Sequence, residues 1–240
     1  MTPGPRLRVS APPLVHARTA AACEAAVVGV LRGGQWVGGP TLKTAEMALA
    51  RAAGRLHAVG VGSGTSALTL ALQAAGIGLG DEVIVPAVSF VATATAVLRA
   101  GAQPVLVDVT PGMPLLDPTQ VKAAWSPSVK GVVAVQLFGN RVAPLHGIPE
   151  DAVVVDDAAQ AMGRDLPIGH GRVATFSFYP TKVLPSAGDA GLVATGSTEL
   201  ACIDLQSGGL QPLPPSLSRV LASALKEPDH PAPPPGSSLN

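Results

Sequence analysis

Cysteine, aromatic residues and charge are all scarce in this sequence, and each shortage narrows what the protein can do. The two cysteines, Cys23 and Cys202, lie far apart and match neither a disulfide framework nor a metal-site spacing. Charged residues make up 13% of the 240 residues and the formal net charge is zero, which argues against a broad basic surface for nucleic acid. The composition therefore favours a small-molecule site and no nucleic-acid partner.

Long apolar runs and clustered histidines are missing as well. No uninterrupted apolar run reaches membrane-spanning length, and the first residues lead into no apolar signal-peptide region. These features predict a cytoplasmic protein that does not contact a membrane. No metal site is expected, because ligand spacing is absent among the histidines, which are His16, His57, His146, His170 and His230.

From His57 onward, short apolar runs alternate with turns and helical segments. The runs are rich in β-branched residues and lack polar alternation, which is typical of strands buried on both faces of a mainly parallel sheet. Helical spacing predicts helices over residues 66–75 and 91–100, each ending before a glycine. The predicted strands are 57–61, 82–86, 104–109, 131–138, 152–156, 175–179 and 191–195. This pattern predicts an α/β fold in which a seven-stranded, mostly parallel sheet lies between helices in three layers.

The chain divides into three predicted parts. Residues 1–55 form a helical lead-in, with helices expected at about 19–31 and 42–53. Residues 56–207 form the large α/β domain. Residues 208–240 are proline-rich and are expected to be mobile, with a short helix possible only at 216–226.

A glycine-rich turn follows the first predicted strand and opens a helix, with the sequence Gly-Ser-Gly-Thr-Ser-Ala at 62–67. Small residues there let backbone N–H groups approach a phosphate, and the helix dipole favours the anion. Thr65 stands where a dinucleotide fingerprint needs glycine, and the Lys-Ser or Lys-Thr of a Walker loop is absent. The turn therefore indicates a phosphate site without a nucleotide motif, although any glycine-rich turn offers part of this chemistry.

Two neighbouring carboxylates follow the strongly apolar run 153–155. Side chains alternate along a strand, so only one of Asp156 and Asp157 is expected to face a ligand at the carboxyl ends of the strands. A carboxylate at that place can keep a pyridinium nitrogen protonated. The alternative is that either aspartate caps a helix.

Lys182 follows the aromatic run 176–179 and a proline. Burial beside the end of a strand disfavours the charged form of an amine and prepares it for Schiff-base chemistry, although a lysine taken alone is more often a solvated loop residue.

Phe90 lies at a predicted strand-to-helix junction, where a phenylalanine either stacks on a flat ring or fills the core.

Taken together, these motifs resemble the DegT/DnrJ/EryC1/StrS family of sugar aminotransferases, which are fold-type I enzymes dependent on pyridoxal 5′-phosphate (PLP). The resemblance runs from about residue 33 to residue 200. It is carried, in order and spacing, by segments 34–40, 62–72, 80–86, 100–104, 157–160, 176–182 and 188–191.

The resemblance implies a role for each matching position. Lys182 matches the lysine that forms the internal aldimine with PLP and then moves a proton, and Asp157 matches the partner of the pyridine nitrogen. Phe90 would stack on the ring face, and Gln160 would contact the ring near its hydroxyl. The cofactor phosphate would be held by Gly64, Thr65, Ser66 and Ser177.

The resemblance also implies an activity, which is transfer of an amino group from an amino acid, expected to be glutamate, to a keto-sugar, expected to be nucleotide-linked, in a homodimer. Family members usually continue into a C-terminal domain, which nothing after Leu200 resembles. The alternative is therefore a truncated, catalytically silent homologue that binds the cofactor or a partner protein. A nucleotide-binding Rossmann protein is disfavoured by Thr65.

Overall fold

The computed structural model describes residues 17–162, 169, 171–186, 188–196, 202–203 and 210–211. The chain forms two compact units, Met1–Glu199 and Leu200–Asn240. In the second unit, β8 (Cys202–Ile203) and β9 (Leu210–Gln211) pair antiparallel. The predicted helix at 216–226 and the expected mobility of residues 212–240 lie outside the described residues. The domain boundaries expected at residues 56 and 208 stay predictions.

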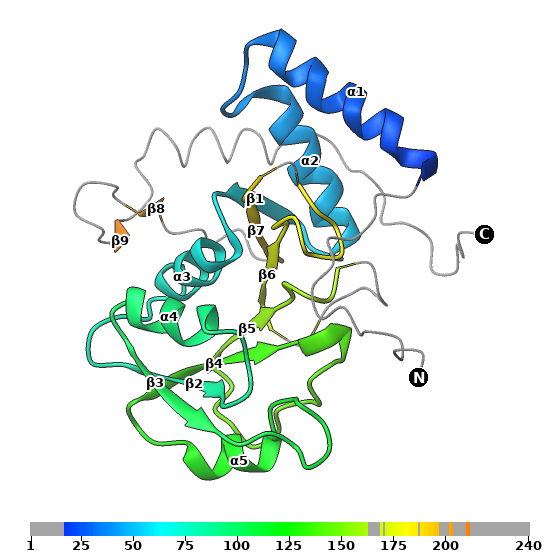
Figure 1. Cartoon of the computed structure of the whole chain (residues 1–240). Coiled ribbons are helices and arrows are strands. Elements are labelled where there is room, and N and C mark those ends of the chain that lie inside the picture. Colours follow the sequence, from blue (N-terminus) through cyan, green and yellow to red (C-terminus); the bar gives the residue numbers. More distant parts are fainter. Residues whose placement is uncertain are drawn as a thin grey trace, which may run out of the picture. The chain divides into compact units, whose positions relative to one another are not determined.

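The first unit is built on a seven-stranded sheet with the order β1-β7-β6-β5-β4-β2-β3 (Figure 1). β7 runs antiparallel to both of its neighbours, and the other neighbouring strands are parallel. The predicted mainly parallel sheet is therefore confirmed. The strands are β1 (His57–Val61), β2 (Glu82–Pro86), β3 (Gln103–Val107), β4 (Val129–Val135), β5 (Val153–Asp157), β6 (Val173–Ser177) and β7 (Gly191–Thr195).

Some strand ends differ from the predicted ones. β4 ends at Val135 and not at residue 138, because the chain turns there into the 3-10 helix η1 (Leu137–Gly139), in which Phe138 has a left-handed backbone with φ of 55°. β6 ends at Ser177, two residues before the predicted end at 179. Lys182 therefore lies in a turn beyond the strand.

The helices begin and end where local chemistry favours it. They are α1 (Ala17–Gly33), α2 (Gly39–Ala52), α3 (Gly64–Ala74), α4 (Ala92–Arg99) and α5 (Pro118–Ala124). Asp117 caps α5, since its side chain accepts the Thr119 N–H at 2.8 Å, and Pro118 opens the helix. Trp125 follows α5 in extended backbone and packs against the core.

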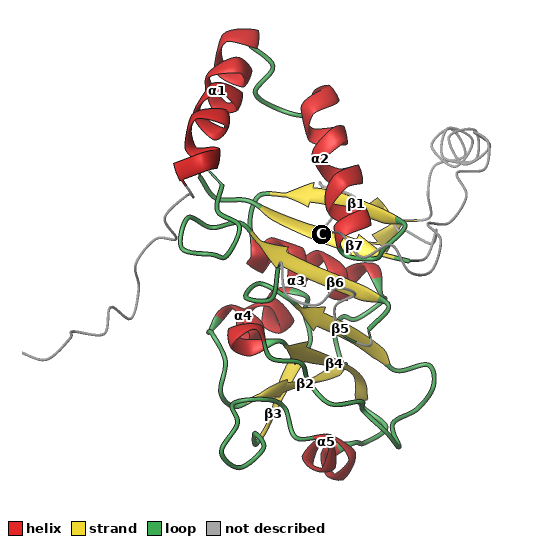
Figure 2. Cartoon of the chain, turned by 90° about the vertical axis from the view of Figure 1, so that its right-hand side faces the viewer, coloured by secondary structure: helices red, strands yellow, loops and turns green. Residues whose placement is uncertain are grey.

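The helices cover the sheet on both faces. The chain passes from β2 through α4 to β3 on one side, then returns past β2 through α5 to β4. Right-handed crossovers in opposite directions place α4 and α5 on opposite faces, and Figure 2 shows α3 beside α4 and away from α5. No helix in the described part of the chain is long and apolar enough to cross a membrane.

Buried apolar side chains form two clusters. The larger one joins α3 and α4 to the central strands and includes Leu72, Ile84 and Val132, none of which is exposed. The smaller one surrounds the fully buried Phe176 on β6 and includes Met162 and Leu192. The apolar runs of the sequence thus lie in strands buried by these clusters.

The parallel arrangement has a consequence for function. The carboxyl ends of β1, β2, β4, β5 and β6 meet at one edge of the sheet, and the start of antiparallel β7 joins them there. Ligands bind at this edge in open α/β sheets. The residues that follow these strands, from Gly62 after β1 to Lys182 after β6, are therefore brought together although they are distant in the sequence.

We expect Leu72→Ala to lower the free energy of unfolding by about 2–5 kcal/mol, because the side chain is fully buried between α3 and the sheet. The matched control is Leu79→Ala, at a leucine that is 98% exposed and should change stability by less than about 0.5 kcal/mol. Urea unfolding followed by circular dichroism measures both. Equal effects of the two variants would contradict the packing described above.

Candidate active site

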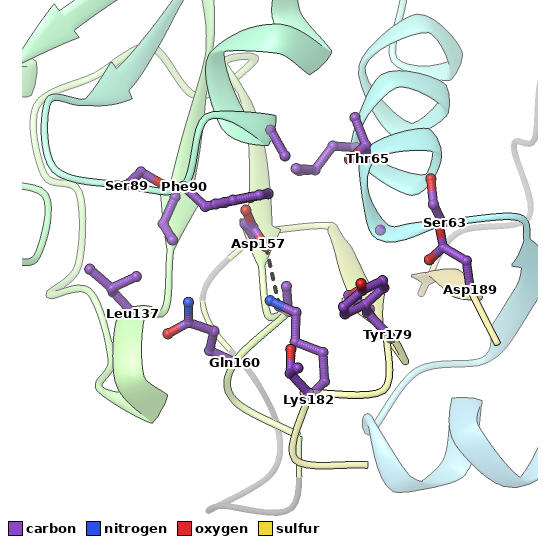
Figure 3. Close-up of a pocket in the computed structure, with 17 residues that line it drawn as sticks. Ser63, Thr65, Ser89, Phe90, Leu137, Asp157, Gln160, Tyr179, Lys182 and Asp189 are labelled. Atoms are coloured by element: carbon purple, nitrogen blue, oxygen red, sulfur yellow. Dashed lines mark hydrogen bonds between the residues drawn. The ribbon is translucent and has the colours of Figure 1, made fainter. Parts of the chain in front are cut away.

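A cavity of about 580 Å³ opens at the carboxyl ends of the strands (Figure 3). Its walls come from the turn after β1 and the start of α3, the junction between β2 and α4, the ends of β4, β5 and β6 with the residues that follow them, and Asp189 before β7. Its volume is in the range of small-molecule sites. Among the described residues, no group of three or more histidine, cysteine, aspartate or glutamate side chains could hold a metal ion.

The turn between β1 and α3 forms one end of the cavity. Ser63 has an extended backbone and caps α3, because its side chain accepts the Ser66 N–H at 3.1 Å. Gly64 and Thr65 open the helix and line the cavity, and because the first N–H groups of a helix have no partner within it, an anion fits there. Ser66 does not line the cavity, and its hydroxyl pairs with that of Ser63 at 2.9 Å.

This turn lies against the ends of β6 and β7 so closely that only glycine fits. A Cβ atom on Gly64 would come within 2.7 Å of the Ser177 Cβ, and one on Gly191 would come within 2.3 Å of the Ser63 carbonyl oxygen. The absence of these Cβ atoms lets Ser177 line the cavity beside Thr65. Hydroxyls from two distant segments thereby flank the start of α3.

Asp157 ends β5 and points into the cavity with only 7% of its surface exposed (Figure 3). One carboxylate oxygen, Oδ1, accepts the Ala159 N–H at 3.1 Å, and Oδ2 accepts the Thr93 hydroxyl at 3.4 Å. Burial raises the pKa of Asp157 above its usual value, and this effect outweighs the Ala159 N–H, the attraction of Lys182 and the Thr93 hydroxyl, which all lower it. A buried carboxylate of this kind gains from a cationic N–H partner.

Asp156 faces away from the cavity, as the strand alternation predicted. Its Oδ2 accepts the Gly171 N–H at 2.8 Å and lies 3.7 Å from the Arg55 guanidinium, which also donates to the Gly171 carbonyl at 2.7 Å. Its Oδ1 accepts the Gln136 amide at 3.2 Å. The two neighbouring carboxylates thus differ in role. Asp156 binds Gly171, Arg55 and Gln136 on one side of β5, and Asp157 faces the cavity on the other.

Lys182 is half-buried in the turn beyond β6, where its backbone N–H donates to the Tyr179 carbonyl at 2.8 Å. Its ammonium lies 6.0 Å from the centre of the Phe90 ring, at the outer limit of a cation–π contact. Phe90 is 65% exposed and lines the cavity, so it is not core filling. Figure 3 shows Lys182, Phe90 and Asp157 pointing into the same space.

Gln160 lines the cavity and supports a strained neighbour. Its Oε1 accepts the Phe138 N–H at 2.8 Å. Phe138 lies in the 3-10 helix η1 (Leu137–Gly139) with φ of 55°, a left-handed conformation that costs about 1–3 kcal/mol for a residue other than glycine. The Gln160 side chain therefore helps to hold the segment after β4 in place.

Several cavity residues carry no role in the sequence-based prediction. Tyr179 and Thr181 belong to the aromatic run before Lys182, and Asp189 belongs to the Gly-Asp-Ala-Gly segment, so the motifs contained them without indicating their direction. Ser63, Leu68 and Ala159 likewise lie within the quoted segments 62–72 and 157–160. Nothing in the local sequence marks the remaining cavity residues, because the fold alone brings them together; these are Ser89, Ala92, Val135 and Leu137.

The cavity has four features that fit one flat, charged ligand. The start of α3 with Thr65 and Ser177 fits a phosphate, and the buried Asp157 fits a protonated ring nitrogen. The Phe90 ring offers a surface for stacking, and the Lys182 amine lies near it. PLP carries a phosphate, a ring nitrogen and an aldehyde on one flat ring, so the residues present fit this cofactor.

We expect Asp157→Asn to stabilise the cofactor-free protein at about pH 7. The folded-state pKa of Asp157 is raised above its unfolded value, so its stability contribution is greatest below the unfolded pKa of about 3.9 and is lost as the pH rises through the folded pKa. The advantage of the amide should therefore shrink as the pH falls toward about 4. Urea unfolding of both proteins across this range measures it, and a variant less stable than wild type at pH 7 would contradict the buried charge.

Comparison with known proteins agrees with this geometry. A family model described as the DegT/DnrJ/EryC1/StrS aminotransferase family matches residues 18–212. A protein from Streptomyces venezuelae, named dTDP-3-amino-3,4,6-trideoxy-alpha-D-glucose transaminase, is 43% identical over 190 residues, which cover 74% of this chain and 49% of that protein. The chain spans about half the length of the curated relatives it matches.

Solved structures give the same result. DesV from Streptomyces venezuelae aligns with a TM-score of 0.69 and 37% identity, covering 87% of this chain and 62% of that one. NtdA from Bacillus subtilis, solved with bound cofactor PMP, aligns with a TM-score of 0.69 and 30% identity, covering 76% of this chain and 43% of that one.

These likenesses confirm the predicted fold class and the resemblance found in the sequence. The aminotransferases of the matched family depend on PLP, and the cavity at the carboxyl ends of the strands fits that cofactor. The chain belongs to the DegT/DnrJ/EryC1/StrS aminotransferase family.

Proposed function

We propose that this protein is a PLP-dependent aminotransferase that moves an amino group from an amino acid, with glutamate as donor, to a nucleotide-linked keto-sugar. One observation carries the proposal. The Lys182 amine, the buried Asp157 carboxylate and the opening turn of α3 line one cavity although they lie far apart in the sequence. The 43% identical relative named as a sugar transaminase supports the choice of acceptor.

Lys182 and Asp157 have the catalytic roles in this proposal. When bound, PLP supplies an electron sink for the bond broken at the amino-acid Cα. Lys182 holds the cofactor through its aldehyde carbon and afterwards moves a proton at the substrate Cα. Asp157 accepts the ring N–H, and its burial makes that ion pair strong because few water molecules compete.

The remaining residues bind and orient the cofactor. Thr65, Ser177 and the first N–H groups of α3, including that of Gly64, bind the phosphate. Ser66 does not contact the cofactor in this proposal. Its hydroxyl and N–H bind the side chain of Ser63, the residue that caps α3. Phe90 covers one face of the ring, and Gln160 contacts the ring near its hydroxyl while its Oε1 holds the Phe138 N–H.

We also propose that the enzyme acts as a homodimer in the cytoplasm. Two exposed aromatic side chains line the cavity, Phe90 at 65% and Tyr179 at 50% exposed, and Phe138, 69% exposed, follows the lining residue Leu137. Exposed apolar surface beside a site is typical of an interface, and a second subunit would cover it. The scarcity of cysteine suits a reducing compartment.

We expect PLP added to the purified protein to produce an absorbance band of the lysine-linked cofactor. Lys182→Ala should abolish this band and lower transamination by at least about a hundredfold, since the variant loses both the attachment and the proton transfer. The matched control is Lys130→Ala, at an exposed lysine whose amine bonds only to the Pro127 carbonyl among the described residues. A band that survives in Lys182→Ala would assign the attachment to another amine.

A catalytically silent homologue is the second candidate, motivated by the half-length match to the curated relatives. Glutamate separates the two candidates. An active enzyme converts bound PLP to its amine form, so the absorbance band should disappear within minutes and 2-oxoglutarate should form in equal amount. A stable band in excess glutamate, with D-glutamate as the control, would favour the silent homologue.

A further inference from the structure

The Asp157 carboxylate contacts the buried hydroxyl of Thr93, a residue that lies outside every motif found in the sequence. Thr93 is 2% exposed and lies in the first turn of α4, and its hydroxyl donates to Asp157 Oδ2 at 3.4 Å. The Ser89 hydroxyl lies 2.7 Å from the same Thr93 oxygen, and Ser89 lines the cavity. A chain of two hydroxyls therefore leads from the cavity wall to the carboxylate.

The direction of this hydrogen-bond chain follows from the number of protons. A threonine hydroxyl has one proton and accepts with its lone pairs. Since an ionised carboxylate only accepts, Thr93 must donate to Asp157 and accept from Ser89. Ser89 thus orients the Thr93 proton toward Oδ2.

We propose that Thr93, oriented by Ser89, is a positioning residue that holds the Asp157 carboxylate in the plane where it meets the cofactor nitrogen. The proposal rests on the proposed function for the identity of that nitrogen. Two donors act on the carboxylate from opposite segments, since Ala159 N–H binds Oδ1 and Thr93 binds Oδ2. With both oxygens tied, rotation about the Cβ–Cγ bond is restricted.

The charged groups around Asp157 allow the Thr93 hydroxyl to have a measurable effect on the pKa of that carboxyl. Lys182, on the turn after β6, attracts Asp157, whereas Asp156 points to the other side of β5 toward Arg55. Asp189 lines the cavity near Ser63, on the segment before β7 (Figure 3). Burial raises the pKa of Asp157, and the Ala159 N–H, the Lys182 charge and the Thr93 hydroxyl oppose that rise. Removing the hydroxyl should therefore raise the pKa of Asp157 further.

The chain offers closely matched variants. Thr93→Val keeps the branched shape at Cβ and removes only the hydroxyl, while Thr93→Ser keeps the hydroxyl and removes the methyl group. Thr95→Val makes the same change two residues away on α4, at a position that does not line the cavity. Comparison of the three separates loss of the hydrogen bond from loss of packing.

The first measurement needs no cofactor. The carboxyl carbon resonance of Asp157, identified by its disappearance in Asp157→Asn, is followed against pH by NMR in the cofactor-free protein. We expect the titration midpoint of Thr93→Val to move to higher pH and those of Thr93→Ser and Thr95→Val to stay at the wild-type value. An unchanged midpoint in Thr93→Val would overturn the link between Thr93 and Asp157, whether or not the wild-type protein binds PLP.

The second measurement is the dissociation constant of PLP, from absorbance titration. We expect about a tenfold weaker affinity in Thr93→Val, since a hydrogen bond to a charged group contributes about 1.5 kcal/mol, and less than about a threefold change in Thr93→Ser. Equal losses in the two variants would assign the effect to packing and overturn the proposal. Absence of PLP binding by wild type would instead contradict the proposed function, and the first measurement would still decide the role of Thr93.

Discussion

The close contact between the opening turn of α3 and the ends of β6 and β7 holds the site together. Gly64 and Gly191 lie so near to Ser177 and Ser63 that a Cβ atom on either would overlap its neighbour. This contact brings the helix N-terminus, which favours an anion, to the strand that leads to Lys182. A phosphate bound at the turn would thereby fix how far the rest of a flat ligand reaches toward Asp157.

The two adjacent aspartates of β5 illustrate how one strand serves stability and function at once. Asp156 is buried with Arg55, Gln136 and the Gly171 N–H, so its charge is matched by donors from several segments. Asp157 is nearly as buried but has fewer compensating groups, and burial raises its pKa. A buried, ionised carboxylate lowers the stability of the free protein, and binding of a cationic ligand restores that free energy. Carboxylates of this kind are therefore common at functional sites.

Part of the site could be predicted from the sequence, because several of its functional groups belong to local motifs. The glycine-rich turn, the aspartate after an apolar run and the lysine after an aromatic run each have a local physical signature. Thr93 and Ser89 have none, since a threonine in a helix carries no sign that its hydroxyl meets a carboxylate 64 residues away. The displaced ends of β4 and β6 were missed for a related reason, because strand ends depend on hydrogen bonds to neighbouring strands.

The sequence alone determined the α/β class, the mainly parallel seven-stranded sheet and that the two aspartates of β5 lie on opposite sides of the strand, because hydrophobic periodicity and side-chain alternation are properties of neighbouring residues. Only the tertiary structure decided which strands are neighbours, that β7 runs antiparallel, and that Ser66 pairs with the cap residue Ser63 while Thr65 lines the cavity. These outcomes depend on contacts between segments distant in the chain, and such contacts leave no pattern in any one segment.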